Sequence, residues 1–477
     1  MGIADIPAED PATYEMIRRA DTIGVFQIES RAQMAMLPRL QPERFYDLVI
    51  EVAIVRPGPI QGDMVHPYLR RRQGLEAEDY PSEAVREVLA RTLGVPIFQE
   101  QVIKLAMVAA GFSAGEADGL RRAMAAWRRR GGLEPYRQKL MQGMAQRGYA
   151  RDFAERIYRQ ILGFGEYGFP ESHAASFALL AYASAWLKCH HPAAFCAALL
   201  NSQPMGFYQP AQLVRDAREH GVTVLPVDVR HSGWDCSLEA VAGRPALRLG
   251  LRMVAGLSQA GAERVVRARD EGGLADVQGL ASRAALERGD LSALAAADAL
   301  QGLSGHRYQA AWQAAGVEQA LPLFPLPAGD AQAAELSAPS LGHEVLADYA
   351  HLGLSLRAHP LALLRRHLRA RGLLSADEVA ERMPGEVVRT AGLVLIRQRP
   401  GEGKAVFVTV EDETGSQNLL VWADLAERQR RVLLGASLLG VTAEIQRADG
   451  VQHLMCRSLE DHSDLLGRLT VRSRDFH

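Results

Sequence analysis

Hydrophobic positions in the first 205 residues or so recur every three to four residues, which is the period of an amphipathic α-helix. Pro and Gly interrupt this pattern and mark turns, one of them in the stretch RPGPIQG at 56–62. The apolar stretch from Ser172 to Leu200 predicts either one buried helix or two helices that meet near Pro192. The other helices predicted in this region are Tyr14–Arg19, Gln33–Leu40, Ser82–Leu93, Glu100–Ala110, Ala114–Arg130, Pro135–Arg147 and Arg151–Leu162.

The helix predicted at Ala114–Arg130 separates apolar from positively charged positions. At 100° per residue, Leu120, Met124 and Trp127 form an apolar stripe. Four arginines share an arc of about 120° elsewhere on the helix. Such a face fits phosphate oxygens, because guanidinium groups bind them in a bidentate manner. The alternative is a solvated face whose arginines pair with nearby carboxylates.

Two similar units follow between residues 246 and 316. Each has an apolar residue, then Gly-Leu-Ser, then a helical pattern, at 254–269 and at 299–312. This arrangement is typical of a helix-hairpin-helix, in which a glycine-containing hairpin presents backbone N–H groups at the start of a helix. Ordinary glycine-capped helical hairpins are the alternative.

The hydrophobic period changes near the C-terminus. Residues 317–340 are rich in Pro and Ala and read as a linker, and a helical segment follows at 343–382. Five strand-like runs then lie between 387 and 460, with a short helix near Asp424–Arg431 after the third. This order predicts an OB-fold, a small barrel often used to bind single-stranded nucleic acid. The predicted fold class is therefore a multidomain, mainly α protein with a C-terminal all-β barrel.

Composition narrows the class of protein. Among the 477 residues, Lys and Arg (54) nearly balance Asp and Glu (56), but residues 101–150 hold nine basic and three acidic side chains. No apolar run is long enough to cross a membrane, and the N-terminus lacks a signal-peptide pattern, so we expect a cytoplasmic protein without a membrane partner. The four cysteines form no CxxC pair, and the run Cys189-His190-His191 lacks a second ligand pair, so no metal site is predicted.

Several motifs together resemble one family, the bacterial C-family DNA polymerases. The chain resembles their fingers region, tandem helix-hairpin-helix and OB-fold in the family order. The sequence AAWRRRGG after LRRAM, and the ending SRDFH, resemble the error-prone branch rather than the replicative one. The motifs are VFQIESRAQM (25–34), VRPGPIQGDMV (55–65), FQEQV (98–102), LRRAM (120–124), YGFPESHAASFALLAY (167–182) and LGLSLRAHPL (352–361).

The resemblance implies a domain for each part of the chain. Residues 1–230 are expected to form the polymerase fingers, and 231–316 the tandem helix-hairpin-helix that binds duplex DNA. A linker and helical segment at 317–384 precede the OB-fold at 385–462. Residues 463–477 are expected to form a basic tail.

The resemblance also implies roles for single residues. The fingers would bind the incoming deoxynucleoside triphosphate through Arg121 and Arg122. Arg56, Tyr167 and His173 are further candidates, although Arg56 can equally brace a turn and His173 can be a core residue. Glu29 and Ser30 lie where the fingers would meet the palm, but helix capping explains them as well.

Contacts to primer–template DNA are implied by the same resemblance. The hairpin residues would offer backbone N–H groups to phosphates, which carry no sequence information. The stretch QALPLF resembles a sliding-clamp peptide, with Gln319, Leu323 and Phe324 as its contacts. In the OB-fold, Arg397, Phe407 and Trp422 could contact single-stranded template, although Phe407 fits the core better. The DNA-binding candidates are Arg128, Arg129, Arg130, Gly256, Ser258, Gly261, Gly302, Ser304 and Gly305.

The palm carboxylates of this family are not found in the sequence. The family transfers nucleotides with carboxylates, including an Asp-x-Asp pair, that hold two Mg²⁺ ions. No Asp-x-Asp occurs in these 477 residues. We therefore expect the C-terminal portion of an error-prone, translesion or repair polymerase that binds primer–template DNA without extending it. The alternatives are a non-catalytic DNA-binding or clamp-associated accessory protein and a helical enzyme that uses His173 as a base.

Overall fold

The computed structural model describes residues 2–55, 64–130, 133–164, 170–318, 334–399, 405–448, 451–467, 469 and 474–476. The chain divides into two compact units, Met1–His191 and Pro192–His477. This division falls between the two halves of the apolar stretch around Pro192. It does not coincide with the boundary at residue 230 that the sequence suggested for the fingers.

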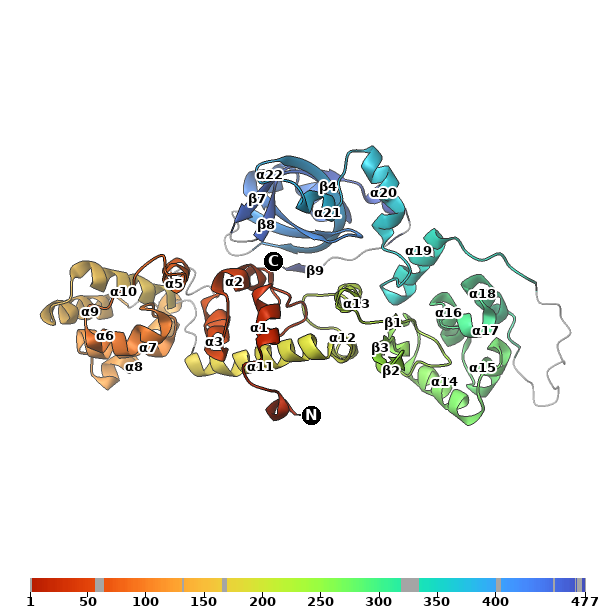
Figure 1. Ribbon diagram of the computed structural model, residues 1–477, viewed down its shortest axis with the longest axis horizontal. Helices are drawn as coiled ribbons and strands as arrows, with labels where there is room; N and C mark the ends of the chain where they lie inside the picture. Colours follow the sequence, from red (N-terminus) through yellow and green to blue (C-terminus); the bar gives the residue numbers. More distant parts are fainter. Residues whose placement is uncertain are drawn as a thin grey trace. The chain divides into compact units, whose positions relative to one another are not determined.

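The described part of the first unit is helical. All seven helices predicted there from periodicity are present, with ends that differ by up to four residues. The stretch before Pro192 forms α11, Glu171–His190, which packs against α1 and α3 (Figure 1). The other helices are α1 Pro11–Arg18, α2 Arg31–Leu40, α3 Phe45–Ile54, α5 Val65–Arg72, α6 Glu83–Leu89, α7 Gln99–Ala110, α8 Ala114–Arg130, α9 Glu134–Gln146 and α10 Arg151–Phe164, with short 3₁₀ turns η1 Ile3–Asp5 and η2 Ala90–Thr92.

Two of these helices, α3 and α5, were not predicted from the hydrophobic periodicity. Every residue of α3 from Asp47 to Ile54 is buried, so the helix has no polar face and no amphipathic period. Its tight packing against α11 is possible because α11 presents small side chains. The buried alanines of α11 are Ala174, Ala178, Ala181, Ala183 and Ala185.

The second unit begins with α12, Pro192–Asn201, so the apolar stretch forms two helices rather than one. Proline stands at the first position of α12, where its missing N–H costs no hydrogen bond. Helix α13, Pro210–Glu219, leads into a small sheet of strand order β1-β3-β2. Its strands are β1 Val224–Leu225, β2 Ser237–Val241 and β3 Arg244–Arg248.

Short helices fill the region of the two predicted hairpin units. The first hairpin unit contains the 3₁₀ turn η3, Leu251–Met253, and helix α14, Gln259–Gly272. The second hairpin unit contains α16, Arg288–Ala296, α17, Gln301–Ser304, and α18, Arg307–Ala315. Helix α15, Val277–Arg283, lies between them in sequence.

The C-terminal strands close into a barrel, as the sequence predicted. The strand order is β5-β6-β8-β7-β4, and an additional β4–β5 pairing closes the barrel. Strands β6 and β8 are parallel, and helices α22, Ala423–Arg428, and α23, Arg430–Gly435, separate β6 from β7. This is the topology of an OB-fold. Its strands are β4 Val387–Gln398, β5 Ala405–Glu411, β6 Ser416–Trp422, β7 Leu438–Ala448 and β8 Val451–Asp461.

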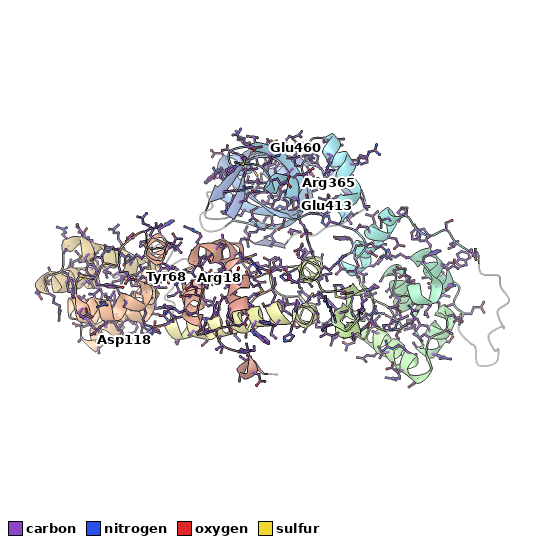
Figure 2. All side chains as sticks on the ribbon, viewed as in Figure 1. Arg18, Tyr68, Asp118, Arg365, Glu413 and Glu460 are labelled. Carbon is purple, nitrogen blue, oxygen red and sulfur yellow. The ribbon has the colours of Figure 1, made fainter. Side chains whose placement is uncertain are left out.

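Three helices of the predicted 343–382 segment precede the barrel: α19 Leu341–Leu352, α20 Pro360–Ala370 and α21 Ala376–Ala380. Arg365 of α20 donates to Asp412 (2.9 Å) and Glu413 (2.5 Å) beyond the end of β5. Figure 2 labels Arg365 and Glu413. The Ala376 amide donates to Asp412 Oδ2, the same oxygen that accepts from Arg365. The buried Asp412 carboxylate therefore joins α20, α21 and the barrel.

Part of the predicted basic tail contributes to the packing. A 3₁₀ turn, η4 Ser463–Leu466, places Leu466 in a buried cluster with side chains of α20 and the barrel, and Leu469 lies in the same cluster. A further strand, β9 Arg474–Phe476, pairs in parallel with the end of β4.

Candidate nucleotide and DNA interfaces

Helix α8 has the two faces that its sequence predicted. Leu120 and Met124 are each 1% exposed and anchor one side of the helix. Arg121 and Arg122 are exposed on α8 beside one carboxylate, Asp118, which is labelled in Figure 2. The side chains of Arg128, Arg129 and Arg130 lie outside the described residues, so their expected DNA contacts stay predictions.

Asp118 is the shared partner of the two arginines. Arg121 Nη2 lies 2.8 Å from Asp118 Oδ1, and Arg122 Nη2 lies 3.0 Å from Asp118 Oδ2. The hydrogen bond from Arg121, followed by the charges of both arginines, lowers the pKa of Asp118. All three side chains are about half exposed or more, so these ion pairs contribute little stability. Two guanidinium groups against one carboxylate leave a net positive charge that an anion can meet.

His173 stands in the first turn of α11 and is partly buried. Its ring centroid lies 4.1 Å from that of Phe177, which makes an edge contact with Phe26 at 5.3 Å. The structure thus places His173 in an aromatic row with Phe177 and Phe26. Two other nucleotide candidates, Arg56 and Tyr167, lie outside the described residues.

A cluster beside His173 was not found from the sequence. Glu171, the first residue of α11, accepts a hydrogen bond from the Tyr46 hydroxyl (2.8 Å) and pairs with Arg91 (3.3 Å). The Arg91 guanidinium also lies over the Tyr46 ring, 4.4 Å from its centroid. Burial and the Glu171 contact raise the pKa of Tyr46. The motif YGFPESH contained Glu171, but its partners come from distant parts of the chain.

Ser30 caps a helix, which is one of the two roles considered for it. Its hydroxyl accepts from the amide of Gln33 at the start of α2, at 3.5 Å. Capping with Ser satisfies one of the N–H groups that a helix leaves unpaired at its start. The structure therefore accounts for Ser30 without a role at a domain boundary.

The first hairpin is closed by a carboxylate from its own fold. Gly256 makes the turn at φ +83°, and Ser258 caps α14 by accepting from the Gly261 amide (2.9 Å). Asp290 of α16 accepts from the Ser258 amide at 2.9 Å and from the Ser258 hydroxyl at 3.0 Å. A side chain at Gly261 would overlap this carboxylate. The Ser258 amide and hydroxyl thus already have an acceptor inside the fold, and the expected phosphate contacts of this hairpin stay a prediction.

The second hairpin differs in geometry from the first. Its residues with positive φ are Asp298, at φ +60° before α17, and Gly305, at φ +90° after it. Gly302 and Ser304 lie inside α17, where the Ser304 amide donates to the carbonyl of Leu300 at 3.1 Å. Gly305 follows α17, and its amide donates to the carbonyl of Gln301 at 2.8 Å. The amides of Ser304 and Gly305 thus have partners inside the fold, as those of Ser258 and Gly261 do.

The OB-fold candidates separate into one buried and one exposed side chain. Arg397 is 6% exposed and donates through Nε to the carbonyl of Leu433 (2.6 Å) and through Nη2 to that of Ala436 (2.5 Å). It thus bonds the end of α23. Trp422 is 50% exposed at the end of β6, and Phe407, predicted to fit the core, is only partly buried on β5.

The Cys189-His190-His191 run gains one neighbour in the fold. His190 Nε2 lies 2.9 Å from Asp10 Oδ2, and Asp10, Cys189 and His190 together could present three ligand atoms. The same Asp10 oxygen accepts from Thr13 at the start of α1, so helix capping explains its position. Sulfur and nitrogen ligands do not fit Mg²⁺, which takes oxygen ligands.

Two parts of the chain match known families. Residues 1–148 match the family described as the bacterial DNA polymerase III alpha subunit finger domain. Residues 221–310 match the family described as a helix-hairpin-helix motif, which confirms this motif for the region of the two hairpins. Together with the barrel, these matches define the class as bacterial C-family polymerase architecture.

Curated relatives specify the branch. The chain is 65% identical to the error-prone DNA polymerase of Alkalilimnicola ehrlichii over 100% of its own length and 46% of the relative. The error-prone DNA polymerase of Methylococcus capsulatus is 60% identical over 99% of this chain and 47% of the relative. That of Pseudomonas aeruginosa is 58% identical over 100% of this chain and 47% of the relative. The chain is thus similar to error-prone DNA polymerases over nearly its whole length and spans about half the length of these relatives.

Within the part of the chain that the structure describes, no helix is both long and apolar enough to span a membrane. The clamp-peptide candidates Gln319, Leu323 and Phe324 lie outside that part, so their role stays a prediction.

Proposed function

We propose that this chain supplies the nucleotide-facing and DNA-binding parts of an error-prone DNA polymerase that serves translesion synthesis or repair in the cytoplasm. The observation that carries the proposal is the exposed pair Arg121 and Arg122, which share the single carboxylate Asp118 on α8. A triphosphate bears more negative charge than one carboxylate and offers more acceptor oxygens. Guanidinium groups bind such oxygens in a bidentate manner, so the triphosphate competes effectively for both arginines.

The chain offers a matched control for this pair. Arg18 and Arg19 end α1 and share one carboxylate, Glu15, at the same three- and four-residue spacings. Arg18 Nη2 lies 2.8 Å from Glu15 Oε2, and Arg19 Nη1 lies 4.0 Å from Glu15 Oε1. Removing either pair changes the net charge equally, so a difference between them reports position and not charge.

Binding of a fluorescent deoxynucleoside triphosphate, in the presence of primer–template duplex, tests the proposal. We expect Arg121→Ala with Arg122→Ala to weaken triphosphate binding by about tenfold or more, because two charge-assisted contacts are lost. Arg18→Ala with Arg19→Ala should leave it within about twofold. Equal losses in both double variants would contradict a nucleotide role for α8.

DNA binding by the unmodified chain is a separate test. Affinity for a primer–template duplex should fall steeply with salt, since phosphate contacts release counterions. We also expect no primer extension by this chain alone when deoxynucleotides and Mg²⁺ are supplied, because no Asp-x-Asp pair is present. Extension would overturn the inactivity claim. Salt-dependent DNA binding without triphosphate binding would instead favour a non-catalytic accessory protein.

A further inference from the structure

Arg230 extends from a tight turn between β1 and β2 and is held by Asp228, two residues earlier in the chain. Its guanidinium donates to both carboxylate oxygens of Asp228, from Nε at 3.2 Å and from Nη2 at 2.8 Å. The Arg230 amide adds a third bond to the same carboxylate at 2.8 Å. Asp228 is mostly buried, and the contact with Arg230 lowers its pKa despite that burial. The guanidinium is therefore held in one orientation.

The turn is fixed to the second hairpin at one end and to the first at the other. The amide of Val229 donates to the carbonyl of Ala299, next to the hairpin residue Asp298, at 3.0 Å. Arg269 of α14 donates through Nη1 to the carbonyl of Ser232 at 2.8 Å. Both ends of the turn thus rest on helix-hairpin-helix elements, and its position follows theirs.

Gly302 of α17 provides the seat for the Arg230 guanidinium. A Cβ atom built on Gly302 would overlap Cζ, Nε and Nη2 of Arg230. The glycine of the second Gly-Leu-Ser therefore has a use that differs from a hairpin turn. Its missing side chain lets a guanidinium lie against the first turn of α17.

The remaining side of the guanidinium faces outward. The Arg230 side chain is 43% exposed, and among the described residues Nη1 has no hydrogen-bond acceptor. A held guanidinium with one nitrogen available is suited to a phosphate oxygen, because little rotamer entropy remains to be lost on binding. A contact of this kind carries no base information, which suits a polymerase.

We propose that Arg230, held by Asp228 and seated on Gly302, is a backbone-phosphate contact through which the second hairpin binds duplex DNA. This inference rests on the proposed DNA-binding function and names a residue outside the hairpin glycines. In this assignment the two hairpins differ: Asp290 accepts from Ser258 in the first. The second presents the Arg230 guanidinium to DNA.

Fluorescence anisotropy with a labelled primer–template duplex and the full chain tests the assignment. We expect Arg230→Ala to weaken binding by about five- to tenfold and to lower the salt slope by about 1. Gly302→Ala should weaken binding by about threefold, because its methyl group displaces the guanidinium. Arg230→Lys should recover less than half of the loss, because Lys keeps the charge but not the fork.

The control is Arg244→Ala, which removes the same charge from the exposed first residue of β3, paired with Val241 of β2. It should change affinity by less than about twofold. Equal affinities of the Arg230→Ala and Arg244→Ala variants, with salt-dependent binding retained, would overturn the Arg230 assignment and leave the proposed function standing. Absence of salt-dependent binding by the unmodified chain would overturn the proposed function itself. If melting shows that Arg230→Ala unfolds, the Gly302→Ala result decides.

Discussion

The first hairpin makes its turn at Gly256 and caps its helix with Ser258, whereas the second turns at Asp298 and carries its Gly-Leu-Ser inside α17. The two tripeptides are identical in sequence and lie in different local structures. In the first, glycine supplies the left-handed turn. In the second, an aspartate supplies that turn, which Asp tolerates better than most residues. The shared tripeptide therefore does not mark equivalent positions.

A buried aspartate near each hairpin shows the same divergence. Asp290 bonds the first hairpin from a neighbouring helix, through the Ser258 amide and hydroxyl. Asp298 belongs to the second hairpin itself and pairs with Arg357, which lies beyond α19. The first carboxylate completes a helix start, and the second connects the hairpin to the segment before the barrel. The two hairpins therefore differ in the long-range partners of their aspartates.

Among the changes that test the difference between the two hairpins, Asp290→Ala is expected to have the largest effect on the free energy of unfolding. The change removes the buried Asp290 carboxylate that accepts from the Ser258 amide and hydroxyl in part-buried bonds, and it removes a partner of Arg264, 3.5 Å away. We expect the free energy of unfolding to fall by about 3 kcal/mol in urea denaturation. Asp290→Asn, which keeps one acceptor oxygen, should lose less. A fall below about 0.5 kcal/mol for Asp290→Ala would mean that the first hairpin does not depend on this carboxylate.

The paired changes Ser258→Ala and Ser304→Ala should differ in size. Ser258 caps the fourteen-residue helix α14, so its loss should cost about 1 kcal/mol. The Ser304 hydroxyl bonds only the Leu300 carbonyl, within the same turn, at 2.9 Å. Its loss should stay within about 0.5 kcal/mol. Thermal denaturation of both variants compares the two losses of stability. Equal losses would mean that the two serine hydroxyls contribute equally to stability.

Local pattern predicted much of the fold. Helix α8 was predicted with its full range, and the five strands and the helical insertion of the barrel were found in the correct order. These elements have one buried and one exposed face or a clear change of period, so each is readable from its own residues. Helix α3 was missed because burial on all sides removes that signal.

The candidate site was predicted less well than the fold. The Arg121 and Arg122 face was readable because helical spacing places both beside Asp118. Contacts between distant segments were not readable, and these include Asp290 with Ser258 and Glu171 with Tyr46. Arg397 illustrates the limit: an arginine on a predicted strand gave no sign that it would be buried against the end of α23.

The smallest expected effect concerns the pH dependence of the second hairpin. Burial raises the pKa of Asp298, against the opposing charges of Arg307 and Arg357 and with a contribution from Asp348. One of its oxygens has no hydrogen-bond partner among the described residues, which agrees with that direction. Because the pKa is higher in the folded state, the folded state binds the proton more tightly. The stability that this proton provides is present below the ordinary pKa of 3.8 and is lost as pH rises through the raised value.

Asp298→Asn isolates this contribution, because Asn cannot titrate and tolerates the left-handed turn as Asp does. Urea denaturation of both proteins from about pH 4 to pH 7 gives the difference in free energy of unfolding at each pH. That difference should shift in favour of the Asn variant as pH rises and then level off. A shift in favour of the unmodified chain would mean that the two arginines outweigh burial and lower the pKa of Asp298. The second hairpin would then be held by a charged pair throughout this range, and its carboxylate would resemble that of the first.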